Sequence, residues 1–128
     1  LQVLHVIEQD IHPTFYVTGD TSIFKFQQDL RERSLEALRK FVDSTLVEPT
    51  PYTAHVREGR IAHEIVNFAE KQGSSLIVLA THGLSGLDHF LIGSNSERVA
   101  MLAHEPVFIL VTRNVVQHGQ VDRPAKAS

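Results

Sequence analysis

The feature that most constrains the fold of this chain is its alternation of short β-prone apolar runs with longer amphipathic segments. The pattern predicts strands at Leu1–Ile7, Tyr52–Arg57, Leu76–Ala80 and Val107–Val111, and helices at about residues 23–46, 60–72 and 94–104. Because strands and helices alternate, the strands should pair in parallel, with helices on the faces of the sheet. The sequence therefore predicts an α/β fold.

Three local expectations accompany this fold. In the first helix, the apolar residues that share one side are Phe26, Leu30, Leu38, Phe41 and Val42, and we expect them to face the core. Leu76–Ala80 has the composition of a buried strand. Gly73 stands where a helix commonly ends in the left-handed conformation.

Composition and charge exclude several classes of function. The net charge is −3, no Lys/Arg cluster occurs before the last few residues, and there is no cysteine. Nucleic acid and anionic membranes are therefore not expected as partners, and disulfides and thiolate metal sites are excluded. No apolar run approaches the roughly 20 residues of a membrane span, and no signal peptide is visible, so we expect a cytoplasmic protein.

The limits of the chain also matter. Residues 1–113 are predicted to form one domain, and the polar residues 114–128 a loose tail. The chain begins inside a strand-like run, and its single methionine is Met101. We therefore interpret the sequence as the downstream part of a longer protein.

A glycine-punctuated loop between an apolar strand and a helix is the clearest candidate site. It follows Leu76–Ala80, contains Gly83 and Gly86, and ends at Gly93. Glycine lets a ligand approach the backbone, and free amides at a helix start attract anions, so this arrangement is typical of phosphate binding. The run Ser94-Asn95-Ser96-Glu97 also matches a capping box, a role compatible with anion binding.

The other candidate chemistries are weaker. The eight histidines show no HxxxH or HExxH spacing, so no metal site is predicted. No serine lies in a GxSxG turn. Thr81 and His82 are expected to hydrogen-bond within their loop rather than to order an attacking water. No catalytic residue is predicted.

The glycine loop resembles the motif of nucleotide-binding universal stress proteins. The family spacing is matched by Ala80-Thr81-His82-Gly83, followed after nine more residues by Gly93-Ser94. The segments LHVIE at 4–8 and PVFILV at 106–111 are also similar to the family. The resemblance implies a doubly wound parallel sheet of five strands, with ATP bound at the switch point, where the order of the strands reverses.

The resemblance also implies individual contacts and an assembly. Val6 would touch adenine, whereas ribose and phosphates would lie against a loop and a helix start whose implied contacts are Ala80, His82, Gly83, Gly93, Ser94, Asn95 and Ser96. Mg²⁺ would accompany the phosphates and need few protein ligands. A homodimer would form through the last strand, Val107–Val111.

Two departures from the family pattern stand out. Ala80 replaces the first motif glycine, a change we regard as tolerable because alanine is small. The family's first strand and helix, with an acidic residue at the strand end, have no counterpart. That strand would lie between Leu1–Ile7 and Leu76–Ala80, so its absence leaves a gap of roughly 10 Å. We expect upstream residues or another chain to supply it.

Three functions remain open at this point. The first is an ATP- or adenine-nucleotide-binding regulator of the stress response, which we favour because no catalytic base is evident. The second is an interaction scaffold of the same family that does not bind nucleotide. The third is a slow ATP hydrolase.

Overall fold

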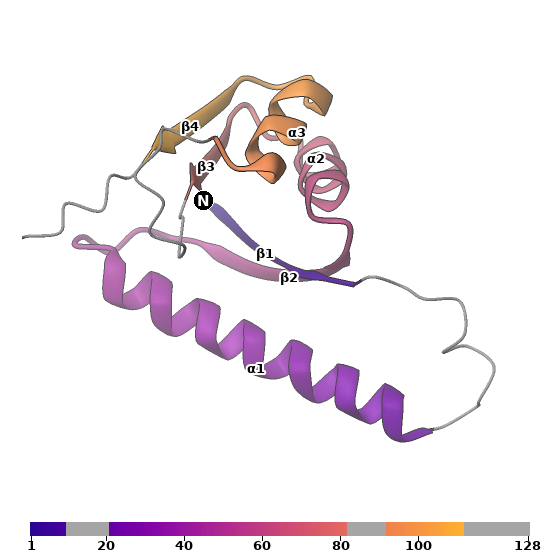
Figure 1. Ribbon diagram of the computed structural model, residues 1–128. Helices are drawn as coiled ribbons and strands as arrows, with labels where there is room; N and C mark the ends of the chain where they lie inside the picture. The colour runs from indigo at the N-terminus through magenta and orange to yellow at the C-terminus, as the bar shows by residue number, and fades with distance from the viewer. Residues whose placement is uncertain (10–20, 82–91, 112–128) are drawn as a thin grey trace, which may run out of the picture.

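The computed structural model describes residues 1–9, 21–81 and 92–111 (Figure 1). Its elements are β1 (Gln2–Glu8), α1 (Thr21–Thr45), β2 (Thr53–Gly59), α2 (Ile61–Gln72), β3 (Ile77–Thr81), α3 (Ser94–Leu102) and β4 (Val107–Val111). Every predicted strand and helix is confirmed in type, with ends within two residues of those expected. The predicted tail at 114–128 lies outside the described residues.

The strand pairs are parallel, as predicted. β1 pairs with β2 from Gln2↔Thr53 to Glu8↔Gly59, and β3 pairs with β4 from Ile77↔Val107 to Thr81↔Val111. Within the described residues these pairs form two separate two-stranded sheets, and β1 is not paired with β3. The additional strand expected between β1 and β3 stays a prediction.

Helices lie on both sides of the strands. In Figure 1, α1 runs along one side of β1 and β2, whereas α2 lies on their other side, next to α3. The main buried cluster is formed by α2, α3 and β3, and its members are Ala62, Val66, Ala69, Ile77 and the fully buried Val99. This arrangement confirms the α/β fold and places α2 and α3 over the same side of the strands.

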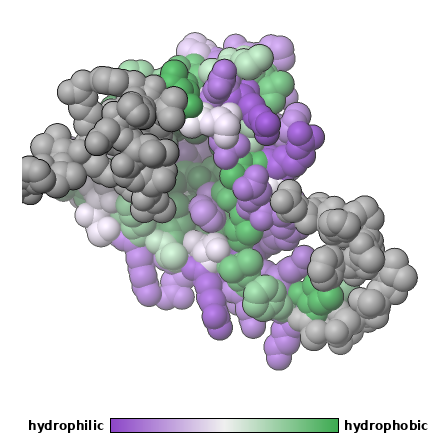
Figure 2. All heavy atoms as spheres, in the orientation of Figure 1, coloured by the Kyte–Doolittle hydropathy of each residue, from purple (hydrophilic) through white to green (hydrophobic). Residues whose placement is uncertain are grey.

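The predicted inner face of α1 is partly wrong. Val42 is buried and Leu38 half-buried, but Phe26 and Phe41 are 68% and 65% exposed. The stripe that faces β1 and β2 runs through Leu35, Leu38 and Val42 at helical spacing, and the two phenylalanines lie on its flank. Figure 2 shows apolar side chains at the surface along α1 and between α1 and the elements above it.

The prediction of a fully buried strand at Leu76–Ala80 is also wrong. Ile77 is buried and Leu79 half-buried, whereas Val78 is 63% exposed and Phe108 on the neighbouring β4 is 57% exposed. Successive side chains of a strand point to opposite faces. Among the described elements, α2 and α3 cover one face of β3 and β4, and nothing covers the other.

Two local features fix the ends of helices. Gly73 adopts the predicted left-handed conformation, with φ 61° and ψ 38°, and its amide donates to the Glu70 carbonyl at 3.1 Å. At the end of α1, the Tyr52 hydroxyl donates to the Asp43 carboxylate at 2.7 Å. This hydrogen bond raises the pKa of Tyr52 above its ordinary value of 10.0 and ties α1 to the start of β2.

None of the helices in the described ranges is both long and apolar enough to cross a membrane.

Candidate functional site

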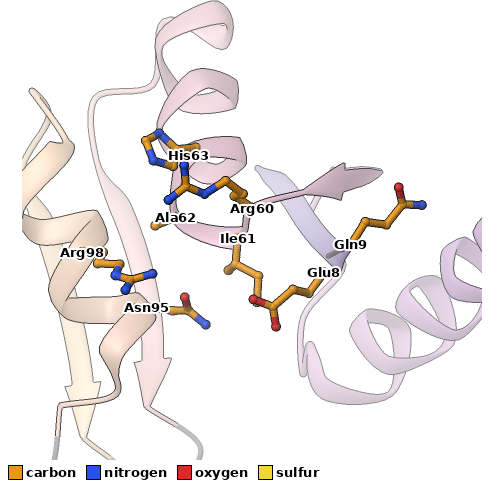
Figure 3. A pocket seen from close by; sticks show the side chains of 8 residues that line it. All are labelled: Glu8, Gln9, Arg60, Ile61, Ala62, His63, Asn95 and Arg98. Atoms are coloured by element: carbon orange, nitrogen blue, oxygen red, sulfur yellow. The ribbon is translucent and has the colours of Figure 1, made fainter. Parts of the chain in front are cut away.

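A pocket of about 220 Å³ opens where β1 ends and where α2 and α3 begin (Figure 3). Its lining residues are Glu8, Gln9, Arg60, Ile61, Ala62, His63, Asn95 and Arg98. The carboxyl ends of parallel strands and the following helix starts are where α/β proteins usually bind ligands. The pocket is therefore a candidate functional site.

The side chains of the pocket come from three elements. In Figure 3, Arg98 and Asn95 project from α3 toward the space, and Glu8 projects toward it from the end of β1. Arg60 and His63 stand at the start of α2. Gln9 is engaged elsewhere, because its Nε2 donates to the Glu58 carboxylate at 2.6 Å. The pocket thus presents both signs of charge.

Among the described residues, no carboxylate forms an ion pair with the arginines of the pocket. Within residues 1–9, 21–81 and 92–111, the ion pairs found are Lys40 with Glu36 and His104 with Glu70. Neither Arg60 nor Arg98 takes part in one, and both side chains are exposed. Two guanidinium groups are consequently available to an anion.

The start of α3 differs from the predicted capping box. Gly93, rather than Ser94, is the residue that precedes the helix, and it supplies no side-chain cap. The Glu97 amide donates to the Gly93 carbonyl at 3.0 Å, so it does not meet the Ser94 hydroxyl. The helix begins one residue earlier than the capping box requires, and this shift makes the prediction wrong.

The uncapped start of α3 leaves backbone donors available. Since the Glu97 amide makes the first bond along the helix, the amides of Ser94, Asn95 and Ser96 have no acceptor inside it. Such amides, together with the helix dipole, favour a negative ligand. The first turn of α3 therefore has the donors that the phosphate-binding prediction requires.

The residues predicted to bind the nucleotide are spread over the described structure. Val6 is half-buried in β1 and Ala80 is exposed in β3, and neither lines the pocket. Gly93 and Ser94 are exposed, whereas the Ser96 side chain is buried, with 8% exposure. Asn95 is the predicted residue that reaches the pocket. His82 and Gly83 lie outside the described residues.

Sequence reasoning missed Glu8, Arg60, His63 and Arg98. Each lies at the carboxyl end of a strand or in the first turns of a following helix. That position is a recognisable signal in an α/β sequence. Charge at the starts of the second and third predicted helices could have been read as part of the same site.

No group of three or more His, Asp or Glu side chains is arranged to hold a metal ion in residues 1–9, 21–81 and 92–111.

Comparison with known proteins identifies the family. The sequence model of the universal stress protein family matches residues 1–118. The chain belongs to this family. It is 34% identical over 109 residues to universal stress protein MJ0531 of Methanocaldococcus jannaschii, covering 85% of this chain and 64% of that protein. It is 30% identical over 115 residues to universal stress protein YxiE of Bacillus subtilis, covering 86% of this chain and 78% of that protein.

Solved structures show the same fold. The structure of MJ0577 superposes with a TM-score of 0.66 at 22% identity, and that of PH0823 with a TM-score of 0.67 at 26% identity. Each alignment covers 88% of this chain and 76% of the other. This universal stress protein chain thus spans less than two thirds of MJ0531 and about three quarters of the two solved structures.

Proposed function

We propose that this universal stress protein chain binds an adenine nucleotide, ATP, as a regulatory ligand. The observation that carries the proposal is the uncapped start of α3, where three amides have no partner within the helix beside a pocket with basic side chains. A triphosphate would satisfy these amides and would be favoured by the helix dipole.

The proposed contacts follow the family motif. Gly93, Ser94, Asn95 and the amide of Ser96 would hold phosphate, and Val6 would contact adenine from β1. Ala80, together with His82 and Gly83, would border the ribose. Gly93 fits this role because the direction in which a side chain would project from it is open. Mg²⁺ bound to the phosphates would supply charge neutralisation and would need few ligands from the protein.

Isothermal titration of ATP into the full-length protein tests the proposal. We expect saturable binding of one nucleotide per chain. The absence of any binding heat, confirmed by equilibrium dialysis with labelled ATP, would contradict nucleotide binding and leave the scaffold function.

Slow turnover is the expected chemical behaviour. No general base is identified from the sequence, so binding rather than hydrolysis is the expected activity. We expect product analysis after prolonged incubation with ATP to show little hydrolysis. Rapid release of many phosphates per protein chain would contradict a regulatory role based on binding.

A dimer in the cytoplasm completes the proposal. β4 would pair with β4 of a second copy, because a strand at the end of a sheet offers a template for another strand. The exposed ring of Phe108 projects from this strand, so it would lie close to the interface of such a pair.

An interaction scaffold is the second candidate function, and a specific observation favours it. Val78 and Phe108 are exposed on the uncovered face of β3 and β4, and Phe26 and Phe41 are exposed on α1. Exposed apolar groups of this kind often mark surfaces that meet another protein segment. The nucleotide titration discriminates between the two candidates.

A further inference from the structure

The pocket carries a charge pattern that the glycine motif does not explain. Arg60 and His63 come from the start of α2, and Arg98 comes from α3. Among the described lining residues, the single carboxylate belongs to Glu8. These side chains lie beside the first turn of α3 without belonging to the motif.

The position of Arg98 links the two sets of groups. Asn95 and Arg98 are three residues apart on α3, so both face the same side of the helix, and both line the pocket. A phosphate chain that meets the amides near Asn95 can therefore continue toward Arg98. Arg60, at the residue before α2, borders the same pocket from the neighbouring helix.

The size and polarity of the pocket indicate which part of a ligand it accepts. Its volume of about 220 Å³ lies below the roughly 300–1,000 Å³ typical of sites that enclose whole drug-sized molecules. Its apolar lining side chains are those of Ile61 and Ala62. Such a pocket suits phosphate groups better than a purine, which needs an extended apolar surface.

We propose that Arg60 and Arg98 bind the terminal phosphates of the nucleotide, so that the site selects a nucleoside triphosphate over a monophosphate. This inference rests on the proposed function, because it assigns the distal end of the same ligand. The proximal phosphate lies on the amides of α3, and each added phosphate brings negative charge toward the guanidinium groups. His63 adds a ring nitrogen that donates to the same oxygens, and Glu8 opposes the anion.

Matched substitutions test the assignment. Arg60→Gln and Arg98→Gln each remove one positive charge from the pocket, and Arg33→Gln removes one from an exposed position on α1 that does not line it. We expect each pocket variant to weaken ATP binding by about fivefold to tenfold, the scale of one partly solvated charged hydrogen bond. AMP affinity should change by less than about twofold, and Arg33→Gln should behave as the wild type.

Glu8 supplies a control of opposite sign. Glu8→Gln removes the one negative charge in the pocket lining, so it should tighten binding of ATP in the absence of divalent metal by about twofold to threefold. A variant that merely disturbs the fold would not improve affinity. Melting curves of all four variants should match that of the wild type, because the substituted side chains are exposed.

The readout separates this inference from the proposed function. Titrations use ATP, AMP and inorganic tripolyphosphate on the full-length protein. Equal affinity for ATP and AMP, or unchanged ATP affinity in both arginine variants, overturns the assignment while nucleotide binding stands. If ATP does not bind but tripolyphosphate does, and if Arg60→Gln and Arg98→Gln weaken tripolyphosphate binding, nucleotide binding is refuted. The anion site then stands. No binding of either compound refutes both.

Discussion

Substitution of Gly93 by alanine offers the sharpest test of phosphate binding at α3. Gly93 has φ −57° and ψ 147°, a conformation open to any residue, and a Cβ built there meets no atom of the described residues within 4 Å. Replacing a glycine at such a position stabilises a protein by about 0.4–1 kcal/mol through the unfolded chain. Alanine is a poorer residue than glycine before a helix, by roughly 0.5–1 kcal/mol. The two effects nearly cancel.

Nucleotide affinity should respond very differently. The open space beside Gly93 is where a phosphate would approach the amides of Ser94 and Asn95. A methyl group there would separate phosphate from donors, and we expect at least a tenfold loss of ATP affinity, or about 1.4 kcal/mol. Titration calorimetry measures the affinity, and thermal unfolding shows that the fold is intact.

Gly73→Ala is the matched control for this experiment. Gly73 has φ +61°, which L side chains rarely adopt, so alanine should lower stability by about 1 kcal/mol. That loss corresponds to a fall of roughly 3–5 °C in Tm for a domain of this size. Gly73 lies at the far end of α2 from the pocket, so affinity for ATP should persist. Wild-type affinity in Gly93→Ala would refute the reasoning.

Three further predictions concern assembly, the sheet and pH. Phe108→Glu places a charge on an exposed side chain of β4 and should convert the proposed dimer to monomer in light scattering, whereas a dimer that persists in the variant would exclude this strand as the interface. We expect a strand from upstream residues or from another chain to pair between β1 and β3. A sharp, cooperative unfolding transition of these 128 residues as a monomer would contradict this expectation. Asp43→Asn should lower the pKa of Tyr52, seen by ultraviolet titration. Because that pKa is raised in the folded state, its stabilising effect should be present below pH 10 and disappear as the phenol ionises, more so in the wild type than in the variant.

The order and type of the elements could be predicted because they depend on local pattern. The helical spacing of Ile61, Ile65 and Phe68 and the left-handed glycine at Gly73 act within a few residues of the chain. The parallel pairing followed from the alternation of strands and helices. These features need no knowledge of what packs against them.

Burial and the site depend on which elements meet, and sequence pattern predicted them less well. Phe41 and Val42 are neighbours of the same apolar character, yet one is 65% exposed and the other 5%, because only one of them faces β1 and β2. The capping box predicted at Ser94 is wrong because α3 begins one residue earlier, directly after Gly93. Arg60 and Arg98 line one pocket because α2 packs on α3, so their positions at helix starts could suggest a site but their separation in sequence does not show that they meet.

The register of β1 on β2 has a consequence for biosynthesis. Gln2 pairs with Thr53, so the first strand leaves the ribosome about 50 residues before its partner. At 5–20 residues per second, the nascent strand waits roughly 3–10 s with its hydrogen-bonding groups unmatched. Pairings between distant residues also slow folding generally. Chaperone protection during translation would therefore matter for β1 until β2 has been synthesised.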